Sequence, residues 1–201
     1  MSTKLPVYEL KISEDSSSPL QVAAIALVDA PAIERNWFAF KQQDNPMKFS
    51  SINEDEQIVV GPAMIPDMQI YRRDEDGKEY FVFFSKDTVK CIVQKFYSNA
   101  LQSSANIMHQ SNEPLEGVTY FLSWIKDTAK GMVGLEGDWP EGTWFVGAKI
   151  DNPDVWAKVK SGEIAGFSVE GNFVFTAPET TELTDEEALE KIKEILKGIE
   201  F

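Results

Sequence analysis

The sequence has few of the residues that hold metals and cofactors. It contains one cysteine, Cys91, and one histidine, His109, in 201 residues. A single cysteine excludes an intramolecular disulfide and a cysteine-based metal cage, so a zinc site would need carboxylates almost alone. The glycine-rich motifs that bind phosphates and dinucleotides are absent, as are the HExxH and GxSxG motifs. We therefore expect no cofactor and no metal ion.

Long apolar runs and an excess of positive charge are also absent. No run approaches the roughly 20 apolar residues of a membrane span, and the first fifteen residues contain no signal-peptide segment. Lysine and arginine number 19 against 33 acidic residues, which gives a formal net charge of −14. A basic surface for phosphates is therefore missing. We expect a cytoplasmic protein that is not exported by the Sec pathway and binds neither membranes nor nucleic acid directly.

The chain has enough apolar residues for one well-packed domain. Hydrophobic residues make up 43% of the sequence, including 13 Phe and 5 Trp. The composition changes after Phe175, which divides the chain into a domain at 1–175, an acidic Pro/Glu/Thr linker at 176–183 and an amphipathic helix at 184–201. The helix either packs back on the domain or serves as a docking tail, and the sequence leaves both readings open.

Patterns of apolar residues and turn signals predict an α+β fold with many short strands. Helices are expected at 85–99 and 152–162, where Ser85 and Asn152 are the N-caps. Residues 41–56 are polar and are expected to form a mobile connection. The expected strands lie at 6–12, 21–28, 57–64, 68–73, 79–84, 106–109, 118–125, 132–135, 143–150 and 164–175. The last segment is either a strand pair or one long bent strand, with Gly166 and Gly171 as candidates for a β-bulge.

These absences leave reactions in which a side-chain nucleophile is activated by a general base. His109 is the one imidazole in the sequence that could act as this base. His109 follows a strand-like segment, and imidazole can exchange its proton near neutral pH. Ser168 lies in the segment GFSVEG, where Gly166 and Gly171 would let a substrate backbone approach closely. Backbone N–H groups nearby could hold an oxyanion. Taken singly, His109 also fits a surface histidine, and Ser168 also fits a small polar filler in a strand.

Six segments, in this order, resemble those of a known family. They are ALVDAPAIE at 26–34, VVGPAMIP at 59–66, EYFVFFS at 79–85, NIMH at 106–109, GTWFV at 142–146 and VKSGEIAGFSVEG at 159–171. Together they resemble the XkdF-like phage serine proteases, a family similar to prohead (capsid maturation) proteases and herpesvirus assemblins. The resemblance implies an antiparallel β-barrel-like core with flanking helices, with Ser168 as nucleophile and His109 as general base.

The position of the ALVDAPA segment departs from the prohead protease order, because there a similar element follows the nucleophile strand. Here it lies near the N-terminus, which suggests a circular permutation. The permutation predicts that strand 21–28 lies beside the strand carrying Ser168.

The orienting acid is a second departure. Ala24 and Leu122 stand where relatives carry acids. Glu170 and Asp29 are the candidates here, and Glu170 would share a strand face with Ser168. Each also has an ordinary reading, as a solvated strand carboxylate or as a cap of the Pro-containing turn.

The resemblance implies a serine endopeptidase that cleaves scaffold and major capsid protein segments inside the assembling procapsid, in the host cytoplasm. Self-cleavage is expected in the exposed linker near Pro178, and copies of the chain are a further expected partner. The alternative is a catalytically inactive virion or assembly protein that retains the protease fold.

Overall fold

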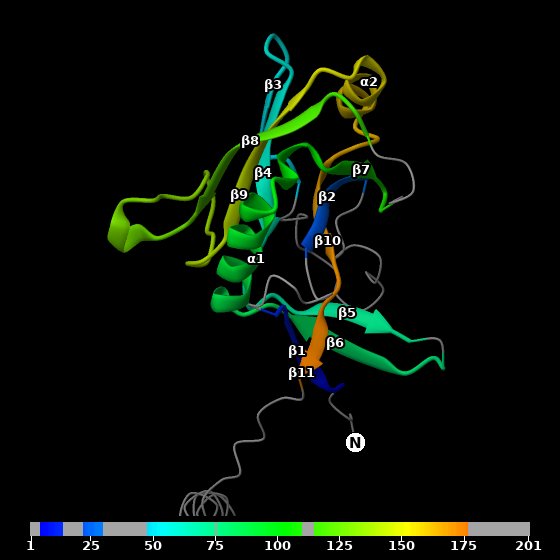
Figure 1. The fold of residues 1–201 in the computed structure, drawn as a ribbon, viewed down its shortest axis with the longest axis vertical. Helices are drawn as coiled ribbons and strands as arrows, with labels where there is room; N and C mark the ends of the chain where they lie inside the picture. The colour runs from blue at the N-terminus through cyan, green and yellow to red at the C-terminus, as the bar shows by residue number, and fades with distance from the viewer. Residues whose placement is uncertain (1–4, 14–21, 30–47, 75, 110–114, 177–201) are drawn as a thin grey trace, which may run out of the picture.

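The computed structural model of the protein describes residues 5–13, 22–29, 48–74, 76–109 and 115–176. Within these residues the fold is α+β, with short strands in three sheets and two α-helices (Figure 1). The strands are β1 Val7–Lys11, β2 Val22–Val28, β3 Ser51–Asn53, β4 Ile58–Met64, β5 Ile70–Arg73, β6 Glu79–Phe83, β7 Ala105–Ile107, β8 Val118–Ile125, β9 Trp144–Ile150, β10 Gly166–Gly171 and β11 Val174–Thr176. The helices are α1 Lys86–Ser98 and α2 Pro153–Ser161, with 3₁₀ turns η2 Leu101–Ser103 and η3 Thr128–Lys130.

The three sheets have different strand orders and meet around one core. Their orders are β11-β1-β6-β5, β10-β2-β7 and β3-β4-β9-β8, and none of them closes on itself within the described residues. The segment between β8 and β9 projects from the body as an arm (Figure 1). The β5–β6 hairpin, expected from the Asp-Gly turn, is present and is closed by the hydrogen bond from Asp74 N–H to the Lys78 carbonyl.

Strand β2 is the central strand of the sheet that matters most for the site. It pairs antiparallel with β10, where Ala26 is opposite Ser168, and parallel with β7, where Ala26 is opposite Asn106. The prediction that strand 21–28 lies beside the strand carrying Ser168 is therefore confirmed. Ala26 and its neighbours Ile25 and Leu27 are completely buried, as expected for a central strand.

Aromatic side chains connect this sheet to the rest of the core. The Phe96 ring of α1 makes edge contacts with Tyr120 on β8 and Trp144 on β9, and Tyr120 in turn contacts Phe167 on β10. The buried Tyr120 hydroxyl donates to the Ile25 carbonyl at 2.8 Å, so β8 supports β2 directly. Helix α1 begins as predicted, because the Ser85 side chain accepts a hydrogen bond from the Thr88 N–H.

Two predicted segments differ from the structure. Residues 132–135 form no strand: Met132 makes only an isolated bridge to Asp127, and Val133 is 67% exposed. The polar connection at 41–56 contains strand β3, whose pairing with β4 uses backbone groups and needs no apolar pattern. Of the two alternatives for 164–175, the strand pair is confirmed, because β10 and β11 are separate strands in different sheets. The predicted linker and C-terminal helix, at 176–183 and 184–201, lie outside the described residues except for Thr176.

Candidate active site

Ser168 occupies the middle of β10 and is only 5% exposed. Side chains alternate along a strand, so Ser168 and Glu170 project from the same face of the sheet. The strand register shifts between Glu170 and Gly171, which places an irregularity beside the site, as the glycine suggested. A buried serine hydroxyl on a strand that is paired along its length with β2 has a well-defined direction, as a nucleophile requires.

His109 lies just beyond the end of β7 and is held by an unusual backbone. The φ angles of Met108 and His109 are +52° and +60°, in the left-handed region that non-glycine residues seldom adopt. Such residues cost on the order of 1–3 kcal/mol each and cluster at functional sites. Two hydrogen bonds hold the turn, one from the Met108 N–H to the Leu27 carbonyl at 3.0 Å and one from the Asp29 N–H to Met108 Sδ at 3.4 Å. The left-handed turn thus fixes the imidazole above β2.

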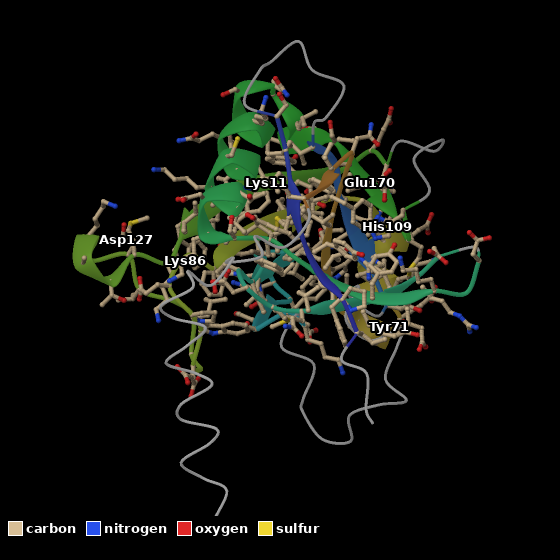
Figure 2. The ribbon with its side chains drawn as sticks, turned by 90° about the horizontal axis from the view of Figure 1, so that it is seen from below. Lys11, Tyr71, Lys86, His109, Asp127 and Glu170 are labelled. Atoms are coloured by element: carbon tan, nitrogen blue, oxygen red, sulfur yellow. The ribbon has the colours of Figure 1, made fainter. Side chains whose placement is uncertain are left out.

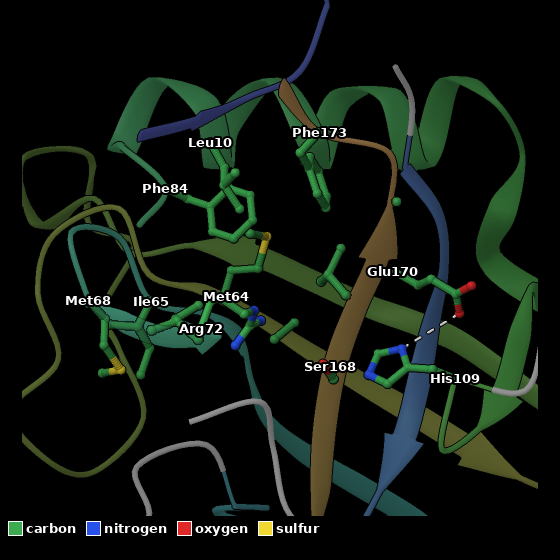
Figure 3. A pocket seen from close by; sticks show the side chains of 14 residues that line it. Leu10, Met64, Ile65, Met68, Arg72, Phe84, His109, Ser168, Glu170 and Phe173 are labelled. Atoms are coloured by element: carbon green, nitrogen blue, oxygen red, sulfur yellow. Dashed lines mark ion pairs between the residues drawn. The ribbon is translucent and has the colours of Figure 1, made fainter. Parts of the chain in front are cut away.

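Ser168, His109 and Glu170 line one pocket. The Nδ1 atom of His109 lies 3.6 Å from Oε2 of Glu170, and the two side chains are 39% and 22% exposed. Figure 3 shows the imidazole between Ser168 and Glu170, with its second nitrogen on the Ser168 side. His109 and Glu170 lie together, away from the arm that carries Asp127 (Figure 2). A carboxylate, an imidazole and a hydroxyl therefore follow one another in the order that nucleophile activation uses.

The sequence reasoning missed Asn106 as a member of the site. Its side-chain Nδ2 donates to Glu170 Oε2 at 2.6 Å, although the two residues lie on strands separated by β2. The intervening side chains are Ala24, opposite Glu170, and Ala26, opposite Asn106. Methyl groups are small enough for Asn106 and Glu170 to meet above them. The signal available in the sequence was an amide between Ala105 and Ile107 in a strand-like segment, and the structure buries this amide to 3% exposure.

The two candidate acids lie in different positions relative to His109. Asp29 is exposed, is not part of the pocket lining, and contributes its backbone N–H to the His109 turn. Glu170 approaches the imidazole directly and is opposite Ala24, one of the two positions where the family resemblance led us to expect an acid. The Glu170 carboxylate on β10 therefore lies directly across from the position on β2 where Ala24 carries only a methyl group. The other such position, Leu122, lies on β8 and is 41% exposed.

The pocket beside these residues is apolar apart from a few polar groups. Its volume is about 400 Å³, at the small end of the usual range for ligand pockets. Strand β5 supplies Arg72 to the lining, and burial lowers the pKa of its guanidinium. The residues that line the pocket are Leu10, Ala63, Met64, Ile65, Met68, Ile70, Arg72, Phe84, His109, Ser168, Val169, Glu170, Gly171 and Phe173.

The described part of the chain has no cluster of metal-binding side chains and no helix that could span a membrane. No group of three or more His, Cys, Asp or Glu side chains is placed to hold a metal ion there. Within the same residues, neither α-helix has the length and apolar character needed to cross a membrane.

A serine, an imidazole and a carboxylate on a rigid sheet, beside an apolar pocket, are the arrangement found in serine hydrolases. The sequence model of the family described as "Putative phage serine protease XkdF" matches residues 47–176. The chain belongs to this family, as its segments indicated. No curated protein and no solved structure matches it. Strand β2 lies outside the matched residues, although it joins the strands that lead to His109 and carry Ser168.

Proposed function

We propose that the protein is a serine endopeptidase that cleaves scaffold and capsid protein segments during phage head assembly. The observation that carries the proposal is the convergence of Ser168, His109 and Glu170 on one pocket. The family membership supports a phage serine protease. A nucleophile, a base and a group that orients the base, gathered at one pocket, are the geometric criteria for a hydrolase site.

The geometry suggests a role for each side chain. The Ser168 hydroxyl oxygen attacks the scissile carbonyl carbon, and the imidazole nitrogen on the Ser168 side takes the hydroxyl proton. Collapse of the tetrahedral intermediate breaks the peptide bond, and His109 returns the proton to the leaving amine. Water then hydrolyses the acyl-enzyme by the same route in reverse. Glu170 holds the other nitrogen and stabilises the imidazolium, and backbone N–H groups near Ser168 would hold the oxyanion.

The substrate would bind in an extended conformation. Strands β10 and β5 are both at the edges of their sheets, and both contribute residues to the pocket. An edge strand has backbone groups available for pairing with an added peptide strand. An extended segment along β10 would bring its carbonyl groups to Ser168, while alternate side chains entered the pocket.

The fold relationship to prohead proteases and assemblins is part of this proposal. The pairing of β2 with β10 supports a circularly permuted version of their barrel-like core, because it brings the ALVDAPA strand beside the nucleophile strand. The substrates proposed are the major capsid protein and the scaffold, within a procapsid in the host cytoplasm. Copies of the chain are included as partners, with self-cleavage near Pro178 in the acidic linker.

Co-expression with the capsid and scaffold proteins of the same phage tests the proposal. Intact-mass spectrometry would compare the wild type with Ser168→Ala and His109→Ala, and with Ser161→Ala as a matched control on α2. Ser161 is exposed, and its hydroxyl donates to the Lys158 carbonyl and accepts from the Glu163 N–H, both close in the chain and away from the pocket lining. We expect defined cleavage products with the wild type and Ser161→Ala, and none with the other two.

Folding must be checked in parallel, by comparing circular dichroism and thermal unfolding of the four proteins. Cleavage that continues in a folded Ser168→Ala variant would refute the proposal. Processing absent from all four would favour the alternative, an assembly protein that keeps the fold without the chemistry.

A further inference from the structure

The wall of the pocket opposite Ser168 contains a cation that the proposed chemistry does not use. Arg72 projects from edge strand β5 into the pocket that Ser168 and His109 line, as Figure 3 shows. Ile70, two residues earlier, lies on the same face and also lines the pocket. Met64 and Ile65 add apolar surface nearby. The guanidinium therefore faces a largely apolar space next to the candidate nucleophile.

Two uncharged groups of the protein, the Tyr71 carbonyl and the Tyr80 phenol, interact with Arg72. Its Nη1 donates to its neighbour's backbone carbonyl, on Tyr71, at 2.9 Å. Among the described residues, no carboxylate lies within ion-pair distance of the guanidinium. Five lysines do have such partners on this acidic protein: Lys11, Lys126, Lys130, Lys149 and Lys158. What distinguishes Arg72 from these lysines is its position, because its guanidinium lines the pocket beside Ser168 and burial lowers its pKa.

The guanidinium has most of its hydrogen-bonding capacity left for a ligand. Arginine carries five N–H donors in a planar fork and remains charged, even where burial lowers its pKa. Removing a cation from water without a counter-charge is unfavourable, and a carboxylate that arrives in the same apolar space offsets that cost. Two parallel N–H···O bonds to a carboxylate are the geometry that the fork fits best.

We propose that Arg72 is a specificity-determining residue, which binds the side-chain carboxylate of a Glu or Asp in the peptide substrate. This inference rests on the proposed endopeptidase function of the same pocket. The apolar lining holds the methylene part of the acidic side chain, and the guanidinium binds its carboxylate. Cleavage therefore requires an acidic residue at a fixed position relative to the scissile bond.

Binding to the full-length Ser168→Ala variant tests the inference without any cleavage. Three probes separate the sources of a carboxylate: N-acetylglutamate N-methylamide carries it on the side chain, N-acetylglutamine carries it at the chain end, and N-acetylglutamine N-methylamide carries none. Titrations followed through the arginine side-chain NMR signals give the three affinities. We expect the first probe to bind at least about tenfold more tightly than the neutral probe, with Kd in the millimolar range.

Two further substitutions assign the effect to Arg72. Arg72→Gln in the Ser168→Ala background removes the preference for the glutamate probe, and Arg73→Gln leaves it intact. Arg73 is the matched control, because it is exposed on the same strand and donates to the Gly77 carbonyl. Arg72→Lys keeps the charge without the fork and is expected to retain part of the preference. It also provides a second variant if Arg72→Gln does not fold.

Equal affinities for the three probes, or no binding up to about 10 mM, would overturn the inference. A preference for N-acetylglutamine alone would assign the subsite to a chain end and overturn the side-chain assignment. The companion measurement is cleavage of a proteome-derived peptide library by the unsubstituted chain, with product termini identified by mass spectrometry. Binding of the glutamate probe without cleavage of any peptide would refute the protease function and support the carboxylate subsite. Cleavage of peptides without a preference for an acidic residue would support the protease function and refute the subsite.

Discussion

The pocket has a charged side chain on each of two walls, Glu170 on the wall formed by β10 and Arg72 on the wall formed by β5, and the two charges have different partners. On the β10 wall, the Glu170 carboxylate accepts a hydrogen bond from Asn106 and lies 3.6 Å from His109 Nδ1. On the β5 wall, the described partner of the Arg72 guanidinium is the Tyr71 carbonyl. The first charge is matched by groups of the protein itself, which fixes the positions of the reacting groups. The second charge is left for a group that comes from outside, which is how a binding site differs from a catalytic one.

Removing the charge of Glu170, on the β10 wall, is expected to have the largest effect on activity. We expect Glu170→Gln to lower kcat by about 10⁴-fold, because an uncharged partner neither holds the reactive tautomer nor stabilises the imidazolium. Asp29→Asn is the matched control and is expected to retain full activity. Peptide cleavage kinetics with both purified variants provide the measurement. An inactive Asp29→Asn beside an active Glu170→Gln would reverse the assignment of the acid.

Asn106 tests whether the carboxylate needs its second partner. A hydrogen bond to a charged group is worth about 1.5–3 kcal/mol, so Asn106→Ala is expected to lower kcat about 10- to 100-fold with KM little changed. Its Oδ1 is buried with no hydrogen-bond partner in the described structure, so the loss of stability should be small. Separate kcat and KM values and urea unfolding check both expectations. A large loss of stability with normal kcat in the folded fraction would show a structural role only.

On the β5 wall, we expect that removing the charge does not lower the stability of the protein. Replacing Arg72 by Met removes a partly buried cation and keeps an apolar side chain, so the free energy of unfolding should stay the same or rise by about 1 kcal/mol. Arg73→Met, on the exposed face, should leave it unchanged. Urea unfolding of both variants gives the comparison. Strong destabilisation by Arg72→Met would mean that the guanidinium already has a partner within the protein.

The smallest expected effect concerns the support beneath the β10 wall. Tyr120→Phe removes the hydrogen bond to Ile25 and should cost about 1 kcal/mol of stability without changing the acidic preference. Burial raises the pKa of Tyr120 above its ordinary value of 10.0. The neutral phenol is thus favoured in the folded state, and its contribution is complete below pH 10 and lost as the pH rises further. Above that pH the wild type should lose stability more steeply than Tyr120→Phe, as unfolding at several pH values would show.

The elements that follow from local patterns were predictable from the sequence. Ser85 and Asn152 cap the two helices as expected, and the alternating and β-branched runs gave most strands. Strand β3 was missed because its partner β4 determines it through backbone pairing, which leaves no mark in a polar segment. The strand predicted at 132–135 was wrong, because this segment belongs to the projecting arm, where Met132 and Val133 remain exposed.

The candidate site was predictable in its residues and less so in its arrangement. Ser168 and His109 came from the family resemblance, and the structure brings both to one pocket. The choice between Glu170 and Asp29 depends on the left-handed turn at His109, which a sequence does not reveal. Arg72 was missed because its importance depends on what surrounds it. Edge strands commonly carry lysine or arginine, so Arg72 is not conspicuous in the sequence. Only the tertiary structure shows that its side of β5 lines the pocket.

The position of β2 has a consequence for when the molecule can become active. Ribosomes release this strand before its partners β7 and β10, and β10 is the last of the three to emerge. Contacts between segments so distant in the chain form slowly and depend on each other. A nascent chain therefore carries His109 long before Ser168 exists, and neither is aligned until the sheet closes around β2. Such an order of synthesis delays proteolytic competence until nearly the whole domain has left the ribosome.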